Sequence, residues 1–348
     1  MHTIQGKFRA KLSSPPIPWS ITDDFLPSLL HHYTTVDGLR GITKSNALWA
    51  SDPRYMNDAS ELTYAASLID GIVKEAYQSL DDDRIHRLVP YHSGIANGFG
   101  QGARPFIACL CEKGDLLSQW RGYGVDTAPV SLGMSLLQMN YPDGLPPRTI
   151  LRKVIYSRDQ QHRSVKWITE SWFQIIASVL DRTKGASIGE WFRPLAIQEL
   201  QQALAVHHLC FKHPSFEEEQ EWRLIRVVDV EEDSRLRDGR RQEVEGVAQK
   251  RTDKAGSETP EPATDGSGAP NDIVDVRFRQ SSLGLVPYVE IPLLDTEGNF
   301  DGRLPLWQVI QGPTSHPELA LDSLRMYLNS CGYGEPTEVL PSDIPLRW

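Results

Sequence analysis

Long apolar runs are absent from this 348-residue sequence, and so is the apolar N-terminal core of a secretion signal. We therefore expect no membrane-spanning helix, no membrane partner and a cytoplasmic location. Basic residues are also in deficit, since 36 Lys and Arg stand against 46 Asp and Glu and give a formal net charge of -10. A chain of this charge is not expected to bind nucleic acid strongly and non-specifically.

Cysteine is scarce as well, with four in the chain, of which only Cys109 and Cys111 lie close together. A zinc site would need a second pair with ligand spacing, so no metal is expected. Alternate residues of a strand point the same way, which favours two buried thiols. The dinucleotide-binding glycine motif, the Walker lysine loop, His-Glu-x-x-His and Gly-x-Ser-x-Gly are also missing.

What is present is 40% hydrophobic residues, enough for a substantial core. Residues 1–20 are polar and proline-rich and predict a disordered or extended tail. Residues 21–348 are expected to form a single α+β domain. Within it, residues 232–271 are polar, with almost no large apolar side chain, and predict a disordered insertion.

Hydrophobic periodicity predicts a mixed, mostly antiparallel central sheet flanked by helices. Strands and helices do not alternate regularly, which disfavours a doubly wound parallel sheet. The expected helices cover roughly 35–45, 58–77, 82–97, 161–181, 190–210 and 316–330, and the expected strands 47–50, 105–111, 129–137, 149–157, 222–230, 272–279, 286–293 and 307–311.

Two polar motifs precede predicted helices. His32-Tyr33-Thr34 ends a short apolar run, just before a helix that Thr35 can cap. A histidine at a strand end offers two ring nitrogens to a ribose or phosphate, although it can equally satisfy a backbone carbonyl. In the second motif, Asp58 suits a helix N-cap with Glu61 three residues on. The neighbouring Asn57 is not needed by that cap and is a ligand candidate.

Two further motifs concentrate aromatic and charged side chains. In Trp120-Arg121-Gly122-Tyr123, the rings suit stacking on a heterocycle and the arginine suits a phosphate. The same rings, three residues apart, could instead form a small hydrophobic cluster. Glu219-Gln220-Glu221 runs into a strand, where both carboxylates would share one side within reach of Arg223. A carboxylate there could accept a sugar hydroxyl, whereas a solvated acidic loop is the simpler reading of the glutamates before it.

The order of these motifs resembles the bacterial family known as domain of unknown function 2971, over roughly residues 26–330. The resemblance is carried by His32-Tyr33-Thr34, Asn57-Asp58 with Glu61, Trp120 and Tyr123, Glu219 with Glu221-Trp222-Arg223, and Gln311-Gly312-Pro313. More distantly, the early histidine-x-threonine, the central aromatics and the late glutamate-x-glutamate are similar to the signature of ADP-ribosyltransferases.

That second resemblance implies a split sheet like that of ADP-ribosyltransferases, with NAD as co-substrate. The activity would be ADP-ribosyl transfer to an unknown macromolecular acceptor, or NAD glycohydrolysis, by an intracellular toxin or defence effector. His32 and Thr34 would hold NAD, and Trp120 or Tyr123 would stack on nicotinamide. Asn57 and Arg121 are the further nucleotide-binding candidates.

The catalytic group implied by the resemblance is Glu221 or, failing that, Glu219, holding the ribose hydroxyl, together with His32. The other glutamate could act as general base for the acceptor. Convergence of His32, Tyr123 and Glu221 would favour this hypothesis.

Two other classes of function remain open from the residues. A non-catalytic nucleotide-binding or interaction module could use the same residues to sense a ligand. A metal-dependent nuclease or phosphotransferase would require Asp58, Glu219 and Glu221 to converge.

Overall fold

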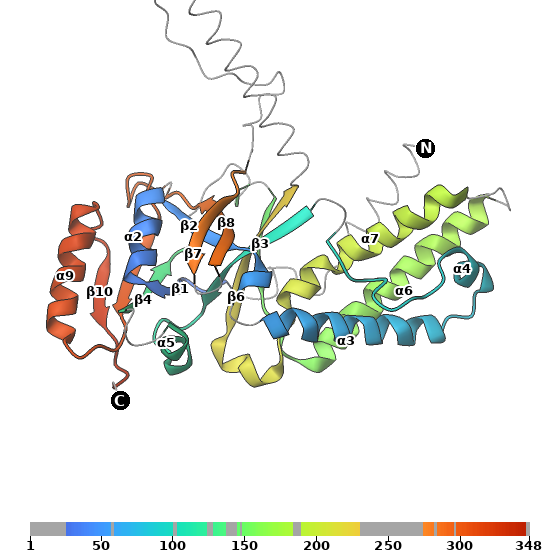
Figure 1. Ribbon diagram of the computed structural model, residues 1–348, viewed down its shortest axis with the longest axis horizontal. Helices are drawn as coiled ribbons and strands as arrows, with labels where there is room; N and C mark the ends of the chain where they lie inside the picture. The colour runs from blue at the N-terminus through green and yellow to red at the C-terminus, as the bar shows by residue number, and fades with distance from the viewer. Residues whose placement is uncertain are drawn as a thin grey trace, which may run out of the picture.

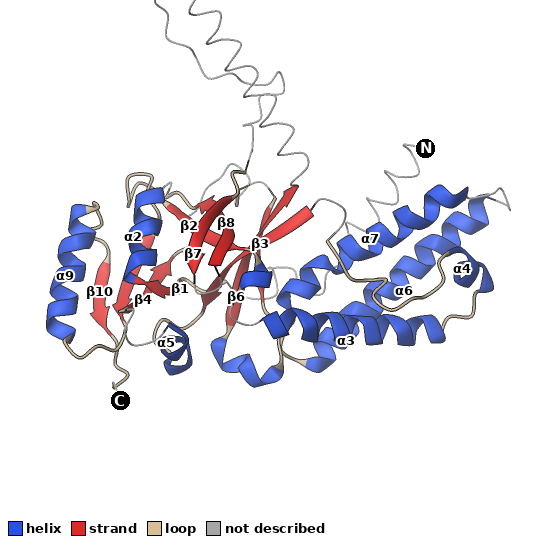
Figure 2. Cartoon of the chain, viewed as in Figure 1, coloured by secondary structure: helices blue, strands red, loops and turns tan. Residues whose placement is uncertain are grey.

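The structure is a computed structural model and describes residues 26–56, 59–99, 103–123, 128–136, 145–146, 148–183, 189–229, 274–281, 284–295 and 297–345. The molecule is elongated, with a β-sheet toward one end and a group of long helices toward the other (Figure 1). Figure 2 shows this segregation of strands and helices. The expected mixed, mostly antiparallel sheet flanked by helices is confirmed.

The strands of the sheet come from widely separated parts of the chain. They are β1 Leu30–Thr35, β2 Ala47–Ser51, β3 Ala103–Cys111, β4 Pro129–Met134, β5 Thr149–Lys153, β6 Glu221–Asp229, β7 Arg277–Ser281, β8 Gly284–Pro292, β9 Leu306–Gln311 and β10 Glu338–Pro341. The main order is β10-β9-β4-β1-β3-β2-β8-β7, with β6 pairing both β3 and β5. Among these strands only β9 and β10 pair in parallel.

The sheet forks at β3. One edge of β3 pairs with β6 along its whole length, whereas the other edge pairs with β1 at Cys111 and with β2 at Ile107. Between these two points, Nδ1 of His32 lies 2.9 Å from the carbonyl oxygen of Cys109. The β1 and β2 branches therefore diverge from a common strand, with the His32 ring bonded to that strand at the fork.

The helices divide between the two ends of the molecule. They are α2 Val36–Ser45, α3 Ala59–Gln78, α4 Asp83–Leu88, α5 Leu117–Tyr123, α6 Arg158–Thr183, α7 Gly189–Cys210 and α9 Pro317–Ser330, with 3-10 helices η1 Pro53–Tyr55 and η3 Pro214–Glu219. Helices α2 and α9 lie beside the sheet, whereas α3, α4, α6 and α7 gather at the far end (Figure 1).

Each end has its own apolar core, because each amphipathic helix must bury one face. Leu39 and Ile42 of α2 and Leu328 of α9 join the core of the sheet. The second core lies among the long helices and includes Trp172 of α6, whose Nε1 donates to the Ala196 carbonyl of α7 at 2.8 Å.

Local signals predicted most elements well, and most of the errors lie at their ends. Thr35 caps α2 as expected, accepting a hydrogen bond from the Gly38 amide at 3.1 Å. The helix expected over 82–97 stops at Leu88. Pro90 follows two residues later and disfavours helical backbone at Val89, the residue before it.

Three strands are shorter than expected and one was missed. The strand predicted at 129–137 ends at Met134, that at 149–157 ends at Lys153, and that at 272–279 begins at Arg277. The partly exposed β10 was not predicted. Apolar alternation does not say where a partner strand supplies hydrogen bonds, and that partner determines the ends.

Candidate functional site

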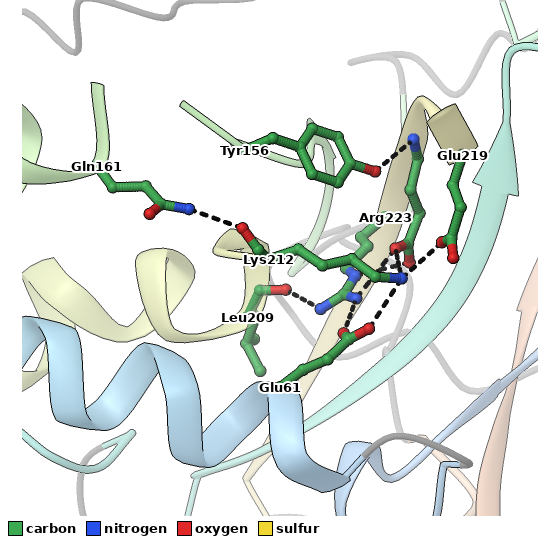
Figure 3. Close-up of polar contacts among 8 residues, drawn as sticks. Glu61, Tyr156, Gln161, Leu209, Lys212, Glu219 and Arg223 are labelled. Carbon is green, nitrogen blue, oxygen red and sulfur yellow. Dashed lines mark hydrogen bonds and ion pairs between the residues drawn. The ribbon is translucent and has the colours of Figure 1, made fainter. Parts of the chain in front are cut away.

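Five charged side chains meet where the long helices join the sheet (Figure 3). Glu61 comes from the start of α3, Lys212 follows α7, Glu219 ends η3, and Glu221 and Arg223 lie at the start of β6. We call this group the Lys212 cluster. Four members lie between residues 212 and 223, whereas Glu61 lies 162 positions before Arg223, so the tertiary fold brings Glu61 to the other four.

Lys212 lies at its centre. The Nζ atom is 2.8 Å from Oε1 of Glu61, 2.6 Å from Oε2 of Glu219 and 3.0 Å from Oε2 of Glu221. An ammonium group has three N–H donors, so these three carboxylates use all of them. The lysine is thus held with no donor left for a ligand.

Arg223, two residues after Glu221 on β6, completes the network. Its Nε donates to Oε1 of Glu221 at 2.8 Å, and its Nη2 donates to Oε2 of Glu61 at 2.5 Å and to Oε2 of Glu221 at 3.1 Å. Nη1 donates to the carbonyl of Leu209 near the end of α7. Arg223 therefore ties two helices to the sheet.

The backbone around η3 presents both glutamates to the same lysine. Gln220 has a φ of +43°, a left-handed conformation that ends η3 and turns the chain into β6. On the other side, Gln161 of α6 donates to the Lys212 carbonyl at 2.9 Å, and the Tyr156 hydroxyl accepts from the Glu221 amide at 3.0 Å. Figure 3 shows these supports around the cluster.

Burial and charge act in opposite directions on Glu221. Burial alone would raise the pKa of its carboxyl, but the charges of Arg223 and Lys212 outweigh that effect and lower the pKa to about 2. Burial would likewise lower the pKa of Lys212, yet the surrounding carboxylates raise it. These groups hold one another in their charged forms.

Glu219 differs from the other two carboxylates. Burial raises its pKa, and the bond from Lys212 only partly offsets that effect. Its Oε2 is bound by Lys212, whereas its Oε1 has no hydrogen-bond or ion-pair partner among the described residues. The Glu219 side chain is 15% exposed, against 12% for Glu61 and 3% for Glu221. Glu219 is therefore the carboxylate of the cluster with one oxygen that no described residue binds.

The structure brings some of the sequence-predicted residues together and separates others. Glu219 and Glu221 converge as expected, with Arg223 on Glu221. His32 is the third residue of β1, not its last, so the expectation of a strand-end histidine is wrong.

His32 also lies away from Glu221. The register pairs His31 with Cys111, and Cys111 with Glu221, so these three share one face of the sheet. Alternation along the strand puts His32 on the other face of the sheet. It shares that face with the core residue Leu132 of β4, with which it is paired. The same alternation puts Thr34 on the His32 face, where its Oγ1 packs against Gly38 of α2.

The aromatic motif is a packing element. Trp120 is buried, its ring edge contacts Tyr33 at a centroid distance of 4.7 Å, and its Nε1 donates to Oδ1 of Asp115 at 2.6 Å. Arg121 is exposed on the same short helix. This favours the hydrophobic-cluster alternative for Trp120 over stacking on a ligand.

Three predicted residues cannot be placed in this way. Asn57 and Asp58 lie outside the described residues, and so does the side chain of Tyr123 at the end of α5. Helix α3 begins at Ala59, close to the expected start, but Glu61 is engaged by Lys212 and Arg223.

Lys212 is the residue that sequence reasoning missed. It follows the buried run Leu209-Cys210-Phe211, and a lysine directly after such a run was a signal that its ammonium group needs buried partners. Glu61 was interpreted as a capping residue because a helix start explained it locally.

Among the described residues no group of three or more His, Cys, Asp or Glu has a metal-binding arrangement. In the Lys212 cluster, the two cations lie where a metal ion would have to bind the carboxylates. No helix in the described ranges is long and apolar enough to cross a membrane.

Comparison with protein families gives one finding. Residues 119–224 match the family described as "Protein of unknown function (DUF2971)". That stretch includes α6, α7 and four members of the Lys212 cluster, and it supports the resemblance noted above over this part of the chain. Comparisons with curated proteins and with solved structures find no match.

Proposed function

We propose that this protein cleaves the bond between nicotinamide and ribose in NAD and passes ADP-ribose to a macromolecular acceptor or to water. Glu219 is the carboxylate that holds the ribose in this reaction. The observation that carries the proposal is the state of its two oxygens, one anchored by Lys212 and the other without a partner among the described residues.

The chemistry suits a fixed carboxylate. When the bond from C1′ to the pyridinium nitrogen breaks, its electron pair stays with nicotinamide, which becomes neutral, and positive charge develops on the ribose. An acceptor atom then bonds to C1′ and loses a proton. A carboxylate that accepts a ribose hydroxyl stabilises this charge more in the transition state than in the substrate.

Glu219 fits that role better than Glu221. Both oxygens of Glu221 are already bound by Arg223 and Lys212, and its side chain is almost fully buried. Lys212 is a positioning residue here, because it fixes Glu219 without a free donor of its own. His32 lies on the other face of the sheet and has no part in this version of the reaction.

One observation favours a second candidate function. The saturated ion pairs of Lys212 and Arg223 are typical of a structural network that joins elements. The same surface would then bind a nucleotide without chemistry, as a sensing or interaction module. Binding of NAD without turnover would favour this candidate.

The test is nicotinamide release from NAD, with and without cell lysate, for the wild type, Glu219→Gln and Glu218→Gln. Glu218 is the exposed neighbour of Glu219 on η3 and serves as the matched control. We expect Glu219→Gln to lower release by about 100-fold or more, as for loss of a group that stabilises transition-state charge. The assignment would be refuted if the wild type released no nicotinamide, or if both variants lost release equally.

A further inference from the structure

A second polar feature lies at the other end of η3. His213 caps this 3-10 helix, and its Nδ1 accepts a hydrogen bond from the Ser215 amide at 3.2 Å. A nitrogen that accepts from an amide carries no hydrogen, so the ring must carry its proton on Nε2. The fold thereby selects the tautomer of His213.

The donor on Nε2 faces another donor. Nη2 of Arg158, the first residue of α6, lies 3.3 Å from this nitrogen. A guanidinium group has donors only, so the two N–H groups cannot bond to each other. An oxygen atom within hydrogen-bond distance of both nitrogens would accept from both. An anionic oxygen would also offset the charge of Arg158.

The His213 ring is held from one side. The ring of Tyr64 packs edge-on against the His213 ring at a centroid distance of 5.5 Å, and the Tyr64 hydroxyl donates to Gln161 of α6 at 2.9 Å. The imidazole is therefore oriented by a packed ring as well as by the Ser215 amide.

His213 and Glu219 are carried by the same short helix. Residues 213 and 219 stand at the two ends of η3, and a 3-10 helix rises about 2 Å per residue, so their backbones are roughly 12 Å apart along the helix axis. One dinucleotide can span such a distance, with its ribose at one end and its diphosphate at the other.

We infer that Arg158 and His213 form a subsite for a phosphoryl oxygen, and specifically for the diphosphate of the dinucleotide. The identity of the ligand rests on the proposed function, whereas the anion preference rests on the two facing donors. The guanidinium fork supplies further N–H groups for a second oxygen of the same diphosphate.

The test is a calorimetric titration with inorganic pyrophosphate, which requires no turnover. The proteins compared are the wild type, Arg158→Gln and Arg163→Gln. Arg163 is exposed on the same helix and is the control for loss of one positive charge. We expect wild type and Arg163→Gln to bind alike and Arg158→Gln to bind at least tenfold more weakly. Absent binding by wild type, or equal weakening in both variants, would overturn the subsite.

A second variant tests the histidine while keeping its cap. Aspartate is also a strong N-cap acceptor, so His213→Asp preserves the bond from Ser215 but replaces the Nε2 donor with negative charge. We expect wild-type thermal stability with loss of pyrophosphate binding, and retained binding would contradict the inference. Nitrogen NMR of wild type must show the hydrogen on Nε2, and a hydrogen on Nδ1 would also overturn it.

The outcomes separate this inference from the proposed function. Pyrophosphate binding that depends on Arg158, without nicotinamide release, would retain the subsite and reject NAD cleavage. Nicotinamide release that depends on Glu219, with no role for Arg158 in pyrophosphate binding, would do the reverse.

Discussion

Arg223 of β6 donates to the carboxylate of Glu61 on α3 at 2.5 Å, across 162 positions of sequence. This bond joins the long helices to the sheet in a buried place, where an unpaired charge is costly. The arrangement therefore makes the cluster sensitive to the loss of any one member.

Lys212→Met should destabilise the protein strongly. Methionine keeps an unbranched side chain but leaves three carboxylates around it without their shared cation. Breaking a buried pair in this way costs about 3–5 kcal/mol. Urea unfolding at pH 7 measures the change. The control is Lys166→Met, whose ion pair with Glu170 is half-exposed, and it should shift the free energy of unfolding by less than about 1 kcal/mol. Similar losses in both would contradict the prediction.

Stability should fall in acid because of Glu221. Its pKa is about 2 in the folded protein, against 4.5 for the ordinary carboxyl. Its contribution is therefore full above pH 4.5 and is lost as the pH falls toward 2. The shift corresponds to about 3 kcal/mol. Unfolding free energies measured across this window should decline less in Glu221→Gln than in wild type, and parallel declines would argue against the prediction.

Glu219 should titrate above an ordinary glutamate. Burial raises its pKa, so its charge is lost at a higher pH than that of an ordinary glutamate. Carbon NMR of the Glu219 side-chain carboxyl would measure its titration midpoint directly. If ionised Glu219 is required, nicotinamide release should fall as the pH drops through its raised pKa. A Glu219 midpoint at or below the ordinary glutamate value would contradict this.

Trp120 should matter for stability. Trp120→Ala removes a buried ring that contacts Tyr33, at a cost of about 3–5 kcal/mol. Trp120→Phe keeps most of the packing but loses the bond to Asp115, worth about 1.5–3 kcal/mol. Leu117→Ala, at an exposed position of the same helix, should change stability by about 0.5 kcal/mol or less. Thermal unfolding measures all three, and an unchanged Trp120→Ala would refute the packing role.

Two glycine substitutions should act in opposite directions. A Cβ at Gly114 would lie 2.5 Å from Cε1 and Nδ1 of the buried His31, so Gly114→Ala should cost about 1–3 kcal/mol. A Cβ at Gly122 meets nothing within 4 Å, and alanine favours the helix α5, so Gly122→Ala should stabilise by up to about 1 kcal/mol. Chemical denaturation of the two variants measures their free energies of unfolding. Equal changes in both variants would contradict the prediction.

Local patterns were sufficient for much of the fold. The apolar spacing in α6 and α7 predicted both helices to within a few residues, because burying one face of a helix leaves a period of 3.6 in the sequence. The cap at Thr35 was also predictable, because a cap acts only on the next few amides of the chain. The early end of α4 depended on a proline whose effect the helical pattern concealed.

The candidate site was only partly predictable. The sequence by itself determined that Glu219, Glu221 and Arg223 would lie together, because adjacent positions on a turn and strand cannot separate. Only the tertiary structure decided that Lys212 and Glu61 join them and that His32 does not. Partners in a buried ion pair are chosen by which elements pack together, and strand register decides which face each side chain takes. Neither choice leaves a mark in the spacing of residues along the chain.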